Sequence, residues 1–121
     1  MQKKKISIVA GDMVGFSRLI EENEINTLKR QKIIIKDIIE PKLGENNGKL
    51  IKTTGDGFLA VFENCDQSLS FSIEIQNQII DQEKIIMKLL QKKAKFFSFQ
   101  TSIIISRSCF VLYPVCRYNN N

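Results

Sequence analysis

The chain has 121 residues, enough for one domain with a modest core, and 43% of them are hydrophobic while 26% are charged. It contains no histidine, which excludes histidine-based acid–base catalysis and zinc sites with histidine ligands. The three cysteines form no CxxC pair, which favours free thiols in a reducing compartment. No stretch approaches the roughly 20 apolar residues that span a bilayer. We therefore expect a cytoplasmic protein with no membrane span.

The net charge of +5 is spread unevenly along the chain. Residues 1–80 carry 11 basic and 11 acidic residues, whereas residues 81–121 carry seven basic and two acidic ones. All six glycines lie between Gly11 and Gly57. This break in composition predicts a first unit over residues 1–80 and a basic, glycine-free, divergent tail over residues 81–121.

The first elements are predicted from apolar patterning. Residues 5–11 are short, apolar and end in glycine, which is typical of a buried strand. Residues 15–22 favour a short helix, and Asn23 is suited to cap a longer one. In that longer helix, the residues expected to form the apolar face are Ile25, Leu28, Ile35, Ile38, Ile39 and Leu43. Pro41 is expected to strain or kink its last turn, and the asparagine and Gly48 of Glu-Asn-Asn-Gly-Lys to terminate it.

Two strand-like runs follow, over residues 49–53 and 58–63, joined by Thr-Gly-Asp-Gly. Asp56-Gly57 between such runs is a strong signal for a hairpin. Asp66 or Ser68 is a suitable cap for a further helix, whose pattern runs through Leu69, Ile73, Gln76 and Ile80. The order is therefore β-α-α-β-β-α. Beyond it, residues 83–95 either extend that helix or form another, and residues 96–106 and 109–113 favour strands.

Two aspartates 44 residues apart stand at predicted strand ends, Asp12 after the first strand and Asp56 in the hairpin. If these strands are neighbours in one sheet, the two carboxylates converge at its edge. Paired carboxylates without histidine suit a hard cation such as Mg²⁺. The turn after Asp12 opens a helix, whose N–H groups attract phosphate. Taken singly, each motif is typical of an ordinary type I′ turn or strand-to-helix connection, and Lys52 of an exposed strand residue.

Residues 4–80 contain both motifs in order, "DMVGFS" and "KTTGDG", with a long helix between them. This stretch resembles the N-terminal part of a class III nucleotidyl cyclase catalytic domain of the bacterial adenylate cyclase type. Members of that family show D-x-x-G-[FY]-[ST] after a strand and K-T-x-G-D-G in a hairpin. The resemblance implies an α+β, ferredoxin-like fold that works as a dimer with active sites at the interface.

The resemblance also assigns roles to residues of this chain. Asp12 and Asp56 would be the catalytic, metal-bridging aspartates, and the backbone carbonyl of Met13 would add a ligand. Two Mg²⁺ or Mn²⁺ ions would bind there. The triphosphate would be held by Met13, Val14, Gly15, Phe16 and Ser17. Lys52 matches the position that contacts the purine in adenylate-forming members, which favours ATP over GTP.

The implied reaction converts ATP to cyclic AMP and pyrophosphate by two-metal attack of the ribose 3′-hydroxyl, for intracellular signalling. The tail departs from the family, since it lacks the R-I-G-I-x-x-G strand and the segment supplying a ribose asparagine and an arginine. Four residues before Arg107 and Arg117 stand Ile103 and Tyr113 rather than asparagine. The alternative is therefore a truncated or frameshifted remnant that retains nucleotide and metal binding or dimerisation, as a homodimer or with a complete cyclase chain.

The tail also carries a run of lysines, namely Lys84, Lys88, Lys92, Lys93 and Lys95. Such a run is found on surfaces that bind nucleic acid or an anionic membrane. On composition alone we favour a solvated helix face over either partner.

Overall fold

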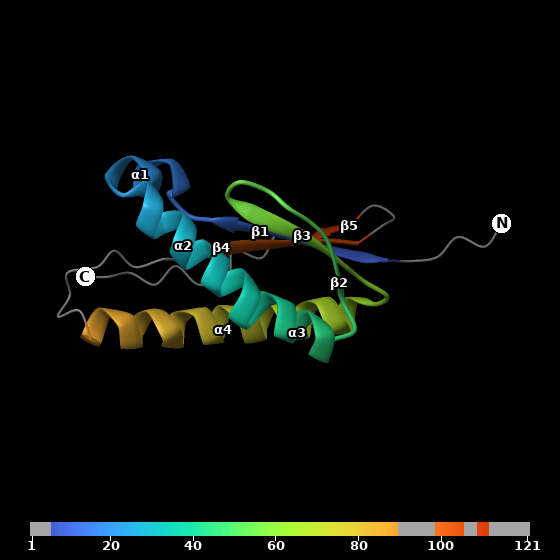
Figure 1. Ribbon diagram of the computed structural model, residues 1–121. Coiled ribbons are helices and arrows are strands. Elements are labelled where there is room, and N and C mark those ends of the chain that lie inside the picture. The colour runs from blue at the N-terminus through green and yellow to red at the C-terminus, as the bar shows by residue number, and fades with distance from the viewer. Residues whose placement is uncertain (1–5, 90–98, 106–108, 112–121) are drawn as a thin grey trace.

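The computed structural model describes residues 6–89, 99–105 and 109–111, with side chains over residues 6–85. Five strands form one antiparallel sheet in the order β2-β3-β1-β4-β5 (Figure 1). The strands are β1 (Ser7–Met13), β2 (Lys49–Thr53), β3 (Gly57–Phe62), β4 (Phe99–Ile105) and β5 (Cys109–Val111). The helices are α1 (Phe16–Glu22), α2 (Glu24–Ile34), the π-helical η1 (Ile35–Ile39), α3 (Glu40–Glu45) and α4 (Cys65–Leu89).

This element order confirms the predicted β-α-α-β-β-α start. The hairpin strand β3 lies between β1 and β2, and β4 pairs with the other side of β1. A sheet in which β4, β1, β3 and β2 follow in that order is the ferredoxin-like, split βαβ arrangement. The ferredoxin-like α+β fold expected from the sequence is therefore confirmed.

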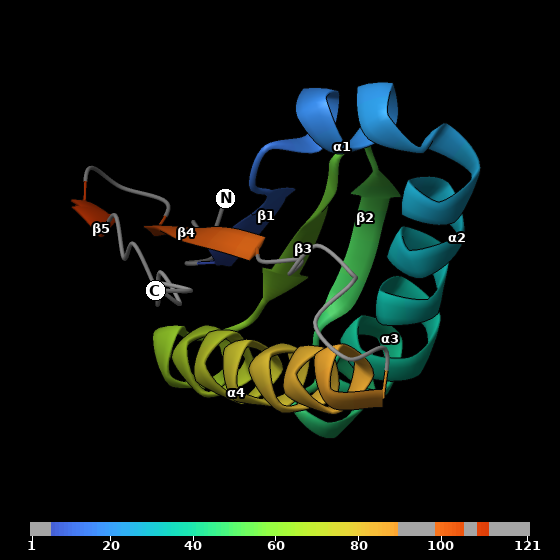
Figure 2. The ribbon, with the colours of Figure 1, turned by 90° about the vertical axis from the view of Figure 1, so that its left-hand side faces the viewer.

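The core lies on one face of this sheet, beneath the helices (Figure 2). Along β1, Val9 and Met13 are buried, and alternate residues of β3 are buried in the same way. Phe58 and Phe62 meet the Phe71 ring of α4, with ring centroids 6.1 and 5.1 Å apart. These aromatic contacts fix α4 against the sheet.

Helix α2 begins where the sequence predicts but buries a different face. The side chain of Asn23 accepts a hydrogen bond from the Asn26 N–H at 3.0 Å, which confirms Asn23 as the cap. The expectation that Ile25 and Leu28 face the core is wrong, since Ile25 is 81% exposed and Leu28 is exposed as well. The buried stripe runs instead through Thr27, Gln31, Ile34 and Ile38. Polar groups thus occupy its first two positions.

The run from α2 to α3 ends in a Schellman motif. Pro41 lies in the first turn of α3, and the helix departs from α geometry directly before that turn, in the π-helical η1. Asn47 adopts the left-handed conformation with φ 57° and Gly48 follows it, which confirms the predicted asparagine–glycine terminator. The Gly48 N–H donates to the Leu43 carbonyl at 2.8 Å, which closes the motif.

Helix α4 starts one residue before the first predicted cap. The Asn64 side chain accepts from the Gln67 N–H at 2.9 Å, so Asn64 caps the helix rather than Asp66 or Ser68. Leu69 and Ile73 are exposed, contrary to the predicted face. Phe71, Ile75 and Ile79 are buried in their place, whereas Gln76 of the predicted face is buried as expected.

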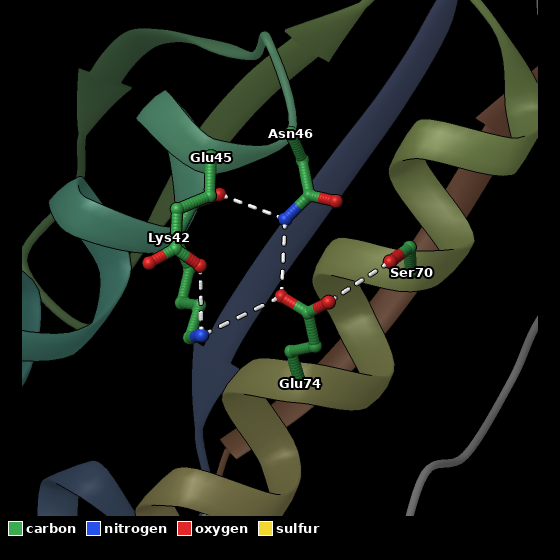
Figure 3. Close-up of polar contacts among 5 residues, drawn as sticks. All are labelled: Lys42, Glu45, Asn46, Ser70 and Glu74. Atoms are coloured by element: carbon green, nitrogen blue, oxygen red, sulfur yellow. Dashed lines mark hydrogen bonds and ion pairs between the residues drawn. The ribbon is translucent and has the colours of Figure 1, made fainter.

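A polar cluster joins the end of α3 to α4 (Figure 3). The Glu74 carboxylate accepts from the Asn46 amide at 3.2 Å and from the Ser70 hydroxyl at 3.1 Å. Lys42 donates to Glu45 at 2.8 Å and lies 3.7 Å from Glu74. The hydrogen bond from Asn46, then that from Ser70 and the charge of Lys42, lower the pKa of Glu74. The cluster holds the turn that leads into β2.

The C-terminal region is described in part. Helix α4 continues to Leu89, which confirms the first of the two alternatives up to that residue, and strands form at β4 and β5. The side chains of Lys88, Lys92, Lys93 and Lys95, and the last asparagines, lie outside the described residues. Among the helices that are described, none is long and apolar enough to cross a membrane.

A methyl group at Gly57 should disrupt the contact between β1 and β3. A Cβ there would overlap the carbonyl oxygen of Gly11, whereas Gly55 has open space around it. Gly57→Ala should lower the free energy of unfolding by about 3 kcal/mol, the upper end for overpacking. Gly55→Ala is the matched control and should change it little. Equal stabilities of the two variants in urea titrations would contradict the predicted clash.

Loss of the α2 cap should cost less. Asn23→Ala removes the side-chain acceptor for the Asn26 N–H and should lower the free energy of unfolding by about 1 kcal/mol. Asn26→Ala keeps the donor N–H, so it serves as the control and should not destabilise the protein. The comparison is made by thermal unfolding, and a control variant that loses as much as Asn23→Ala would count against the cap.

Candidate metal and phosphate site

The register between β1 and β3 brings the two aspartates together. Asp12 lies within β1 as its penultimate residue, not after the strand as predicted, and pairs with Gly57. One residue further on, the Met13 N–H donates to the Asp56 carbonyl at 2.7 Å. The missing side chain of Gly57 permits this close approach of the two backbones. The predicted convergence of Asp12 and Asp56 at one edge of the sheet is therefore observed.

The two carboxyl groups are hydrogen-bonded to each other. Asp12 is exposed, but partial loss of hydration, the hydrogen bond to Asp56 and the charge of Asp56 raise its pKa from 3.8 to about 6. The hydrogen bond from Asp12, assisted by the Thr54 hydroxyl, lowers the pKa of Asp56. The pair therefore titrates as a unit. At a pH below the pKa of Asp12, protonated Asp12 donates a hydrogen bond to ionised Asp56.

The turn that carries Asp56 is held from several sides. Gly15 and Asn47 are the residues with positive φ in the described part of the chain, so the turn is not the type I′ turn of the simplest interpretation. The Thr54 N–H donates to the Gly57 carbonyl at 2.8 Å, and the Thr54 hydroxyl donates to Asp56 Oδ1 at 3.2 Å. From α2, Gln31 Nε2 donates to the Gly55 carbonyl at 2.8 Å.

Next to Asp12, the chain turns into α1. Gly15 occupies the left-handed N-cap position, with φ 69° and ψ 29°. The Leu19 N–H donates to the Gly15 carbonyl at 3.0 Å, so the preceding N–H groups of this first turn have no acceptor within the helix. Of the five predicted phosphate contacts, the Met13 N–H is already bonded to Asp56. The side chain of Phe16 packs against the core and anchors the turn, while Val14 and Ser17 are exposed.

Lys52 lies on the same face of the sheet as Asp12. It pairs with Leu59 of β3, which in turn pairs with Ala10 of β1, two residues before Asp12. Residues that pair across antiparallel strands share a face, and so do alternate residues of one strand. This face is opposite the buried residues of β1, and Lys52 is exposed on it.

The donor set fits a hard divalent cation. Two carboxylates from different strands converge, and mutual repulsion contributes to the raised pKa of Asp12, a cost that a cation between them would remove. No third acidic or cysteine side chain joins them among the residues described. Mg²⁺ is commonly bound by one or two carboxylates and completes its shell with water and substrate phosphates.

Two residues that contact the site were missed from the sequence, Gln31 and Thr54. Thr54 precedes the Gly-Asp-Gly motif directly. Gln31 had a visible signal, because it is a polar residue four positions after Thr27 and three before Ile34. The apolar face predicted through Ile25 and Leu28 lies on a different side of α2 and therefore excludes Gln31.

Comparison with known proteins supports the same conclusion as the motifs. No protein-family model matches the chain. A Rhizobium meliloti (strain 1021) protein named "Putative adenylate cyclase 3" is 29% identical over 93 residues. The match covers 72% of this chain and 16% of that protein. The chain thus spans about a sixth of the curated relative it matches.

Solved structures give the same fold. An adenylate/guanylate cyclase/hydrolase from Silicibacter pomeroyi is 33% identical with a TM-score of 0.72, covering 87% of this chain and 58% of that one. The adenylyl cyclase CyaB from P. aeruginosa, 17% identical, has a TM-score of 0.65 over 86% of this chain and 56% of its own. The second of these likenesses shows the fold alone, whereas the first, with the curated relative and the two motifs, supports a class III nucleotidyl cyclase domain.

Proposed function

We propose that this chain supplies the metal- and triphosphate-binding half of an adenylate cyclase site, which converts ATP to cyclic AMP and pyrophosphate. The observation that carries the proposal is the Asp12–Asp56 pair, fixed by the β1–β3 register beside the start of α1. Two carboxylates next to a turn whose N–H groups have no acceptor within the helix are suited to bind a metal-bound triphosphate.

Each part of the site has a defined task. Asp12 and Asp56 hold Mg²⁺ or Mn²⁺, with the Met13 carbonyl as a further ligand, and the Val14–Ser17 backbone binds phosphate oxygens. Because the Met13 N–H is already hydrogen-bonded to the Asp56 carbonyl, Met13 contributes its carbonyl rather than its N–H. Lys52, on the same face as Asp12, donates a hydrogen bond to the adenine ring. An ammonium group suits adenine because N1 of that base is an acceptor.

In the reaction, the ribose 3′-hydroxyl oxygen bonds to the α-phosphorus, and the bond from that phosphorus to the bridging oxygen of pyrophosphate breaks. The hydroxyl proton passes to solvent. Bound divalent ions would lower the pKa of the hydroxyl and neutralise charge on the phosphates. The chain's own residues hold the triphosphate in line for this attack, through the turn before α1 and the fixed carboxylate pair.

The other half of the site has no counterpart in residues 81–121. Residues 81–121 contain no asparagine–arginine segment of the kind that the family uses for the ribose and the transition state. An arginine in that role contributes about 10³–10⁵ in rate in phosphoryl-transfer enzymes. We therefore expect little turnover from this chain by itself, and turnover at an interface with a complete cyclase domain.

A complementation assay tests this proposal. The chain is mixed with a complete class III cyclase domain whose own two metal aspartates are replaced by asparagine, and cyclic AMP is measured with ATP and Mn²⁺. The mixture should form cyclic AMP. Asp56→Asn in this chain should reduce the rate by about 100-fold or more, since even outer-shell changes at metal sites cost about 10–100-fold.

Asp37→Asn is the matched control, because Asp37 is an exposed carboxylate on η1, away from the site. It removes the same charge and should leave the rate unchanged. Mixtures that form no cyclic AMP, or that tolerate Asp56→Asn, would overturn the proposed reaction. Binding of Mn²⁺ and ATP without any turnover would favour the alternative of a cyclase remnant that binds nucleotide only.

Metal binding should depend on pH through Asp12. With its pKa near 6, Asp12 is mostly ionised at pH 7 and mostly protonated at pH 5. Protons compete with the cation for this carboxylate, so the affinity for Mn²⁺ should be about tenfold weaker at pH 5 than at pH 7. Carbon-13 NMR titration of the Asp12 carboxyl group checks the pKa directly. In Asp56→Asn this pKa should fall, and titration of the wild type near 4 would contradict the coupling.

A further inference from the structure

The Asp56 turn receives a hydrogen bond from outside the sheet. Gln31 Nε2 donates to the Gly55 carbonyl at 2.8 Å across 24 residues of sequence. Figure 2 shows why this is possible, since the end of β2 and the start of β3 lie at the same end of the sheet as α1 and the start of α2. The bonded carbonyl belongs to the peptide group whose N–H is that of Asp56. The contact therefore acts on the backbone directly before the carboxylate.

Gln31 is placed firmly enough to orient that peptide. It is 6% exposed and lies in the buried stripe of α2, between Thr27 and Ile34. A buried amide is costly unless it is hydrogen-bonded, so this side chain has a strong preference for the turn carbonyl. The Thr27 hydroxyl, one turn earlier, donates to the Leu19 carbonyl at 2.9 Å and ties α2 to the end of α1. Polar groups of α2 thus contact both segments that flank the site.

We infer that Gln31 is a positioning residue for metal binding, which fixes the Gly55–Asp56 peptide so that the Asp56 carboxylate faces Asp12. The inference rests on the proposed function, because it assigns Gln31 a role toward the cation held by these carboxylates. Four hydrogen bonds then define the turn: from Gln31 to the Gly55 carbonyl, from the Thr54 hydroxyl to the Asp56 carboxylate, from the Thr54 N–H to the Gly57 carbonyl, and from Met13 to the Asp56 carbonyl. Of these hydrogen bonds, the one from Gln31 connects the turn to a helix.

The test uses Gln31→Met, which keeps the length of the side chain and removes the donor. A second variant, Gln31→Asn, keeps the amide but shortens its reach by one methylene group, so it does not depend on Gln31→Met folding well. Ile34→Val is the matched control, since Ile34 is buried on the same helix one turn later. It perturbs packing without changing any contact to the turn.

Binding of Mn²⁺ to the full chain is followed by paramagnetic broadening of backbone amide signals near Asp12 and Asp56. Both Gln31 variants should bind Mn²⁺ roughly tenfold more weakly, the lower end of the effect of outer-shell partners. The amide signals of Gly55 and Asp56 should also shift without metal. Ile34→Val should change neither, even where its melting temperature falls as far as that of Gln31→Met.

The outcomes separate the two claims. Equal Mn²⁺ affinities in the wild type and both Gln31 variants would overturn the role of Gln31 while the metal site stands. An equal loss in Ile34→Val would also overturn it, because the effect would then follow stability alone. Absence of broadening near Asp12 and Asp56 in the wild type would contradict the proposed function itself, and the inference would fall with it.

Discussion

The antiparallel register between β1 and β3 is the constraint on which the rest of the site depends. It sets Asp12 opposite Gly57 and places the Met13 N–H on the Asp56 carbonyl. A shift of one residue would turn Asp12 to the buried face, because side chains alternate along a strand. Gly57 helps to specify the register, since a side chain at that position would overlap the carbonyl oxygen of Gly11. Gly11, which precedes Asp12, has a steric role as well, because a Cβ there would overlap the ring of Phe58.

The helices pack against one face of the sheet, and the side chains of Asp12 and Lys52 are exposed on the other. Phe58 and Phe62 bind β3 to α4 through Phe71, while α2 contacts the hairpin turn through Gln31. The opposite face carries Asp12 and Lys52. The proposed nucleotide site therefore has a packed core behind it, and its Asp12 and Lys52 side chains are exposed in the part of the chain that the structure describes.

The sequence was sufficient for the strands, the order of the elements and the aspartate pair, because these depend on local apolar runs and on two motifs with little freedom. It was insufficient for helix faces. Ile25 and Leu28 fit an apolar repeat, and Thr27 and Gln31 interrupt one. The tertiary contacts nevertheless bury the polar pair and leave Ile25 and Leu28 exposed. The cap of α4 was missed because Asn64 competes with Asp66 and Ser68, which have similar capping propensities. The buried face of α2, by contrast, depends on packing partners distant in sequence.

The most direct test of the account is the pairing of Asp12 with Gly57. Because the hydrogen bond from Met13 to Asp56 makes the next pair a non-hydrogen-bonded one, the Cα atoms of Asp12 and Gly57 should lie about 4.5 Å apart. A nuclear Overhauser measurement on the full chain should therefore give a strong cross-peak between their α protons. A strong cross-peak from Asp12 to the α proton of Phe58 instead would show a shifted register and contradict the convergence of the two aspartates.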